Sequence, residues 1–154
     1  MLQTAILAAR EAGSILADNL RKPRRTKVKG LRDIVTDADV KAQRAIVEII
    51  QARFPNHDIL SEESAPGSKG QPAVKGCPYT WIVDPLDGTT NYSRRLPCFC
   101  TSIALSYQGE VILGVVYDPL RDDLFQAERG KGAVLNGESL RVSQVESLAD
   151  ALVG

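Results

Sequence analysis

The first third of the chain carries apolar and small residues at helical spacing. Over residues 2–20 they recur every three or four positions, which predicts a helix with one buried face. They are Leu2, Ile6, Ala9, Gly13, Leu16 and Leu20. Pro23 closes this segment, and a second helix is predicted from Thr36 to about Phe54, before Pro55. Its expected apolar line is Val40, Val47, Ile50 and Phe54.

Beyond the second helix the pattern changes to alternating or continuous apolar runs, which are typical of strands. The predicted strands are Asp58–Ser61, Thr80–Asp84, Cys100–Tyr107, Val111–Tyr117, Leu124–Ala127, Ala133–Asn136 and Leu140–Val142. Turn signals lie between them at 108–109, 129–132 and 136–137, and residues 64–78 predict a mobile loop. Two helices followed by hairpin-linked strands predict an α+β fold, with the helices on one face of a largely antiparallel sheet.

Composition limits the function classes. The chain has 154 residues, 44% of them hydrophobic, and its 19 basic and 19 acidic residues cancel. This balance is typical of one globular domain and argues against a surface built mainly for nucleic acid or anionic membranes.

No apolar run approaches the ~20 residues of a membrane span, and no secretory signal is expected. Cys77, Cys98 and Cys100 are expected to be reduced and packed, which favours a cytoplasmic location, and His57 is expected to be a polar loop residue.

Residues 21–32 form a basic stretch with seven Lys or Arg in twelve positions. No aromatic side chain is interleaved for base stacking. A solvated loop with one or two functional cations is therefore favoured, and binding of nucleic acid through this stretch stays open as the weaker alternative.

Acidic residues gather where two predicted strands end. Glu62 follows one strand, and Asp84 and Asp87 follow another, in the segment Asp84-Pro-Leu-Asp-Gly-Thr-Thr. The proline fixes the chain direction at the sheet edge, and Leu86 can turn its carbonyl toward the same point. Two carboxylates and a carbonyl within four residues suit a hard, oxygen-loving cation such as Mg²⁺.

The residues that follow predict an anion site. Gly88, Thr89 and Thr90 would open a short helix or turn whose free N–H groups point outward, and the Thr89 hydroxyl can orient a metal-bound water. Metal carboxylates beside such a helix start make a phosphate ester the natural substrate. The arrangement is that of two-metal phosphoryl chemistry, with ions ~3.5–4 Å apart.

Each element also has a structural interpretation. Asp87 could be a helix N-cap, and Glu62 could end a solvated strand. Thr36 and Asp39 have the spacing of a capping box. The combination of these residues favours the metal site over the separate structural roles.

The segment Asp84–Asn91, preceded by Trp81-Ile-Val and by Ser61-Glu-Glu63, closely resembles the inositol monophosphatase family of Mg²⁺-dependent phosphatases. The likeness covers nearly the whole chain, and further matching segments are Lys29, Asp33–Thr36, Asp39, Leu96-Pro97, Ser102–Leu105, Gly114–Tyr117, Gly130–Ala133, Asn136-Gly137 and Val142-Ser143. It implies the first half of a layered α/β sugar-phosphatase fold. Thr90-Asn91 favours the inositol-phosphatase branch.

The resemblance implies two or three Mg²⁺ ions per site. Glu62, Asp84 and the Leu86 carbonyl would hold the first ion, and Asp84 and Asp87 the second. Glu62 and Thr89 would position the attacking water.

The resemblance also implies supporting roles. Asp39 would assist through the network around Thr89 or through a third, weaker metal, and Lys29 would lie near the metals. The residues implied to contact the substrate are Glu62, Leu86, Asp87, Gly88, Thr89 and Thr90.

Members of this family are longer than 154 residues, so residues 1–154 correspond to the N-terminal metal-binding portion. The other half of such proteins carries a further aspartate ligand in a Trp-Asp motif and most of the sugar-binding residues. We expect Mg²⁺-dependent hydrolysis of inositol monophosphate or another small phosphorylated polyol, inhibition by Li⁺ and homodimerisation, and near-inactivity of the 154 residues alone. The alternatives are a phosphatase of histidinol phosphate or a sugar phosphate, and a catalytically silent fragment that binds RNA or protein.

Overall fold

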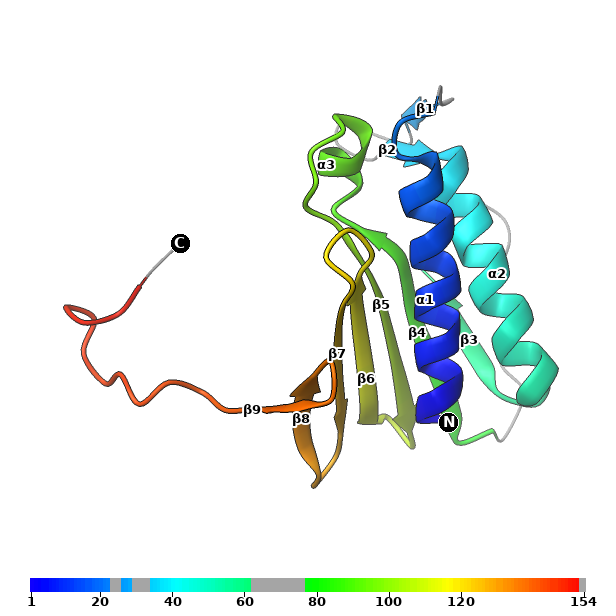
Figure 1. Cartoon of the computed structure of the whole chain (residues 1–154). Coiled ribbons are helices and arrows are strands. Elements are labelled where there is room, and N and C mark those ends of the chain that lie inside the picture. Colours follow the sequence, from blue (N-terminus) through cyan, green and yellow to red (C-terminus); the bar gives the residue numbers. More distant parts are fainter. Residues whose placement is uncertain (23–25, 29–33, 62–76, 153–154) are drawn as a thin grey trace.

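The computed structural model describes residues 1–22, 26–28, 34–61 and 77–152. Helices α1 (Leu2–Asn19) and α2 (Asp37–Arg53) lie side by side against one face of a sheet (Figure 1). The short helix α3 (Thr89–Ser93) lies at one end of this sheet. The predicted α+β class, with two N-terminal helices on a largely antiparallel sheet, is confirmed.

Helix α1 is buried along a face of small side chains, which allow the helix to approach its neighbours closely. The buried positions are Thr4, Ala5, Ala8, Ala9, Ala12, Gly13 and Leu16. Leu2 and Ile6, which were predicted to lie on the buried face, are only partly buried. The buried face of α1 is therefore wider than predicted and is centred nearer the alanines. A Cβ at Gly13 would lie 2.6 Å from the Tyr117 ring, so this part of α1 rests directly on the sheet.

The predicted apolar line of the second helix is partly wrong. Val40 is 58% exposed, and Val47 is only half-buried. The buried positions of α2 are Ala38, Asp39, Ala42, Ile46 and Ile50. The helix is turned toward its alanines because small side chains permit close packing on α1, and Val40 is left on the solvent side.

A small antiparallel pair of strands precedes α2. It consists of β1 (Thr26–Val28) and β2 (Ile34–Thr36), with Thr26 opposite Thr36. The sequence predicts a loop here, because three-residue strands are too short to show a period. Some positions of the basic stretch lie outside the described residues, namely Arg24, Arg25, Lys29 and Arg32. The same holds for residues 64–76 of the predicted loop.

Seven strands form the main sheet in chain order. They are β3 (Asp58–Ser61), β4 (Tyr79–Asp87), β5 (Cys100–Tyr107), β6 (Glu110–Asp118), β7 (Asp123–Glu128), β8 (Gly132–Leu135) and β9 (Glu138–Leu140). Strands β3 and β4 are parallel, and every later pair is antiparallel.

The predicted strands have counterparts, with differences at their ends. Strand β4 runs on to Asp87, and the last predicted strand, 140–142, shares only Leu140 with β9. Asn136 and Gly137 have φ of 49° and 89° and form a two-residue turn. This turn places Glu138 directly opposite Leu135, so β9 begins earlier than predicted.

The two faces of the sheet differ. The face under the helices holds the core, including Trp81, Val83, Ile103, Leu105 and Val115, all at most 2% exposed. On the opposite face a row of uncharged residues is paired across all seven strands: Leu60, Ile82, Ala104, Gly114, Ala127, Ala133 and Leu140. Within the described part of the chain no helix covers this open face, and residues 141–152 run away from the sheet (Figure 1).

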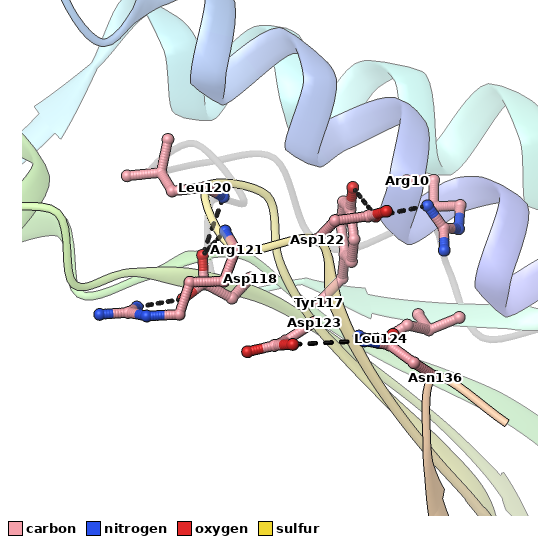
Figure 2. A network of polar contacts seen from close by, with 9 residues as sticks. All are labelled: Arg10, Tyr117, Asp118, Leu120, Arg121, Asp122, Asp123, Leu124 and Asn136. Atoms are coloured by element: carbon pink, nitrogen blue, oxygen red, sulfur yellow. Dashed lines mark hydrogen bonds and ion pairs between the residues drawn. The ribbon is translucent and has the colours of Figure 1, made fainter. Parts of the chain in front are cut away.

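The turn between β6 and β7 is tied to α1 by a polar network (Figure 2). The Arg10 guanidinium donates to the Asp122 carboxylate at 2.7 Å and lies 5.0 Å from the centroid of the Tyr117 ring. The Tyr117 hydroxyl donates to the same carboxylate at 2.9 Å. At the start of β7, next to this turn, the Asn136 side chain accepts from the Leu124 N–H at 2.9 Å. This network fixes the hairpin against the helix layer.

His57 lies in the loop between α2 and β3, as expected, but its ring is also part of an aromatic stack. Its ring lies between Phe54 and Tyr79, with centroids 4.8 and 4.6 Å away. The indole N–H of the buried Trp81 donates to His57 Nδ1 at 3.1 Å. Burial lowers the pKa of His57, although the nearby Asp58 carboxylate opposes this effect.

None of the described helices is long and apolar enough to cross a membrane.

Candidate metal and phosphate site

The candidate site lies where β4 departs from regular pairing with β5. Asp84 is opposite Ser102 and Asp87 is opposite Cys100, so three steps along β4 match two steps along β5. The extra residue is a β-bulge. In a regular strand, residues three apart point to opposite faces, but the bulge restores the phase and places Asp84 and Asp87 on the same face. That face is the open one.

Side chains complete the hydrogen bonding of the bulge. Pro85 and Leu86 together face Thr101, whose hydroxyl donates to the Pro85 carbonyl at 2.9 Å. The Leu86 N–H donates to the Asp84 carboxylate at 3.1 Å. The Thr89 hydroxyl donates to the Leu86 carbonyl at 3.0 Å. The backbone between the two aspartates is therefore held from both sides.

Helix α3 begins directly after the bulge. Gly88 has φ 92°, a left-handed conformation that glycine adopts readily. A Cβ there would lie 2.9 Å from the Cys98 carbonyl oxygen, so the close approach also requires glycine. The Tyr92 N–H donates to the Gly88 carbonyl at 2.9 Å. The N–H groups of Thr89 and Thr90 precede this bond and, by helix geometry, are available to an anion.

The corner formed by β4 and β5 has a negative potential. Cys100 Sγ lies 4.0 Å from an Asp87 carboxylate oxygen. Burial raises the pKa of the Cys100 thiol to about 11, and Asp87, Asp84 and Asp118 add to the rise. The thiol is therefore protonated at neutral pH. A bound cation would relieve the same potential that disfavours the thiolate.

Glu62 and Lys29 of the expected site lie outside the described residues, so their predicted roles stay predictions. Asp39 lies in the first turn of α2 and is 1% exposed. Strand β2, which leads into that turn, contacts α3.

The described donors fit part of a magnesium site. The carboxylates of Asp84 and Asp87 and the Leu86 carbonyl are all oxygen donors, which hard cations prefer. No group of three or more His, Cys, Asp or Glu side chains able to hold a metal occurs in residues 1–22, 26–28, 34–61 and 77–152. Strand β3 ends at Ser61, level with Val83 and at the same end of the sheet as Asp84.

Two residues of β5 that contact this corner were not predicted as site residues. For Cys100 a signal exists, because strand alternation places it on one face with the half-buried Ser102 and Ala104. For Thr101 the sequence offers none, because the position of a bulge in the register cannot be read from alternation alone.

The chain belongs to the inositol monophosphatase family, whose model matches residues 1–154. A curated protein of *Pasteurella multocida*, called Nus factor SuhB, is 42% identical over 155 residues, which is 99% of this chain and 56% of that protein. The inositol monophosphatase of *Dictyostelium discoideum* is 39% identical over 153 residues, 99% of this chain and 55% of that protein.

Solved structures agree with this assignment. The extragenic suppressor protein SuhB of *Bartonella henselae* superposes with a TM-score of 0.84 at 38% identity, over 93% of this chain and 54% of that one. A protein described as an IMPase/NADP phosphatase complexed with Mg²⁺ and phosphate gives a TM-score of 0.71 at 29% identity, over 84% of this chain and 48% of that one. The chain thus spans about half the length of the relatives it matches.

Proposed function

We propose that residues 1–154 are the N-terminal metal-binding portion of an enzyme that hydrolyses a phosphate monoester with Mg²⁺. The observation that carries this proposal is the β4 bulge, which places Asp84 and Asp87 on one face immediately before the Gly88 start of α3. Metal ligands and phosphate-binding N–H groups then belong to one continuous segment. Family membership and the Mg²⁺ and phosphate of the related phosphatase support the same chemistry.

In this proposal Asp84, Asp87 and the Leu86 carbonyl hold Mg²⁺. When bound, the metal supplies Lewis acidity that activates water and stabilises the leaving oxygen. The Thr89 hydroxyl donates to the Leu86 carbonyl, so its oxygen lone pairs can accept a hydrogen bond from the attacking water and orient it. The N–H groups at the start of α3 bind the phosphate oxygens.

The remaining expected residues complete the proposal. Glu62 would add a third carboxylate and, with Thr89, position the water. Asp39 would support that network or a third ion, and Lys29 would lie close to the metals. The full site would hold two or three Mg²⁺ ions.

For the substrate we propose inositol monophosphate or a similar small phosphorylated polyol. Histidinol phosphate and sugar phosphates are the alternatives, because the residues expected to select the alcohol lie in the half of the relatives that this chain does not match. We further propose a cytoplasmic, Li⁺-sensitive homodimer. The three free cysteines support a reducing location.

The test compares inositol-1-phosphate hydrolysis in Mg²⁺ by the parent, Asp84→Asn and Thr89→Ala proteins. The assay uses both the 154-residue chain and the longest product of its gene. Asp84→Asn should abolish turnover in the active form, and Thr89→Ala should lower kcat with little change in KM, because orienting water acts in the transition state. Asp84→Asn protein that retains most of the activity would overturn the proposal. The 154 residues alone should bind Mg²⁺ weakly and be nearly inactive.

A second candidate function is binding of RNA or of a protein partner. It is favoured by the basic stretch 21–32, in which seven of twelve residues are Lys or Arg. Salt-dependent binding of a labelled single-stranded RNA, with no phosphatase activity in any form of the protein, would favour this function.

A further inference from the structure

The β4 bulge has an incomplete set of backbone donors. Pro85 has no N–H and cannot donate to β5. The next N–H, that of Leu86, donates to the Asp84 side chain at 3.1 Å. At the two positions that make the bulge, one donor is therefore absent and the other is directed to a carboxylate. Backbone pairing alone defines this segment poorly.

Thr101 supplies the missing connection across the two strands. It is the residue of β5 that faces both bulge positions, and its hydroxyl donates to the Pro85 carbonyl at 2.9 Å. Thr101 is 0% exposed and the Pro85 side chain is fully buried. Since water does not reach this carbonyl, the threonine hydroxyl satisfies a group that would otherwise be costly to bury.

The Thr101 side chain lies on the helix side of the sheet, in phase with the buried Ile103 and Leu105. The carboxylates of Asp84 and Asp87 lie on the opposite, open face. Thr101 can therefore influence the carboxylates only through the backbone of the bulge. If the bulge straightened by one residue, Asp87 would move to the helix side, because each one-residue shift reverses the face.

We propose that Thr101 is a positioning residue: its hydroxyl locks the bulge and so keeps Asp84 and Asp87 on one face for joint binding of a divalent cation. The inference rests on the proposed function, because it takes these two carboxylates as cation ligands. It adds a residue that touches neither metal nor substrate.

The test measures Mn²⁺ affinity of the 154-residue chain from the electron paramagnetic resonance signal of free Mn²⁺. Thr101→Val keeps the β-branched shape and removes the hydroxyl, whereas Thr101→Ser keeps the hydroxyl. Thr4→Val is the matched control, because Thr4 is 3% exposed and its hydroxyl accepts a hydrogen bond from Arg53 at 3.2 Å, away from the sheet corner. Asp84→Asn reports whether the measured ion occupies the proposed site.

Thr101→Val should bind Mn²⁺ about three- to tenfold more weakly, the effect of one neutral hydrogen bond. Thr101→Ser and Thr4→Val should stay within about twofold of the parent. Equal affinities of Thr101→Val and the parent, with Asp84→Asn clearly weakened, would overturn the role of Thr101 and leave the proposed function standing. Absence of Mn²⁺ binding by the parent, or equal binding by Asp84→Asn, would overturn the metal site and this inference together.

Thermal unfolding distinguishes the positioning role from a purely structural role of Thr101. If the role is purely structural, Thr101→Val should lower the unfolding temperature, as Thr4→Val does, and leave the Mn²⁺ affinity of the folded protein unchanged. That result would overturn the inference. If Thr101→Val does not fold, amide hydrogen exchange of metal-free Thr101→Ser and Thr101→Ala gives the answer. Faster exchange at Leu86 in the alanine variant alone supports the lock, and equal exchange in both variants overturns it.

Discussion

Replacing Gly88 by alanine should destabilise the protein more than the same change at Gly109. Both glycines have a left-handed conformation, with φ of 92° and 86°, which costs a residue with a Cβ about 1–2 kcal/mol. At Gly109 nothing lies within 4 Å of the added Cβ, so this conformational cost is the whole effect. Gly109→Ala therefore serves as the matched control.

At Gly88 the added Cβ also meets the backbone. It would lie 2.9 Å from the Cys98 carbonyl oxygen and 3.2 Å from the Phe99 Cα, and neither atom belongs to a flexible side chain. Overpacking of this kind costs about 1–3 kcal/mol. Added to the conformational cost, it brings the expected loss for Gly88→Ala to about 2–5 kcal/mol.

The assay is urea unfolding of the parent and both variants, followed by circular dichroism. The free energy of unfolding comes from the midpoint at constant slope. Losses for Gly88→Ala and Gly109→Ala that agree within about 0.5 kcal/mol would show that the loop after α3 yields easily, and the reasoning from close approach would be wrong.

Further outcomes are expected elsewhere in the chain. Tyr92→Phe should lower the free energy of unfolding by about 1 kcal/mol, because the buried Tyr92 hydroxyl donates to the Leu16 carbonyl at 2.8 Å; an unchanged urea midpoint would contradict this. The pKa of His57 is lowered from 6.5 in the folded protein, so the unfolded chain takes up the proton first and stability should fall as pH drops below that value. The loss of stability below pH 6.5 that is due to His57 should vanish in His57→Gln. Urea midpoints of the parent and the variant between pH 8 and 5 measure it. The 154-residue chain should self-associate through its open face, and sedimentation as a monomer at every concentration would refute that.

Periodicity predicted the large elements because long amphipathic segments average over local exceptions. It found both long helices and the seven strands of the main sheet. It failed to predict which side chains are buried where burial depends on something other than the hydrophobic period. Val40 is apolar, yet α2 buries its alanines instead, because the fit between two helices depends on side-chain size as well as polarity.

The candidate site was predictable to the level of the segment but not of its geometry. Asp84 and Asp87 could be named from carboxylate spacing and from family resemblance. That their side chains lie on one face of the sheet could not be predicted. In a regular strand, two residues three positions apart point to opposite faces, and the bulge that changes this leaves no periodic signal in the sequence. The contact between Cys100 and Asp87, and the bond from Thr101 to Pro85, depend on the same register.

The order of the seven strands has a consequence for how the sheet is built. Because each strand pairs with its neighbour in sequence, every strand after β5 can join as soon as a short turn closes, with little loop entropy to overcome. Strands β3 and β4 are the exceptions, since β4 reaches β5 through residues 88–99 and β3 reaches β4 through residues 62–78. Folding should therefore be fast from β5 onward and slower where β4 and β3 join. The β5–β6 hairpin, closed by the two-residue turn at Gln108 and Gly109, should then form before the rest of the sheet.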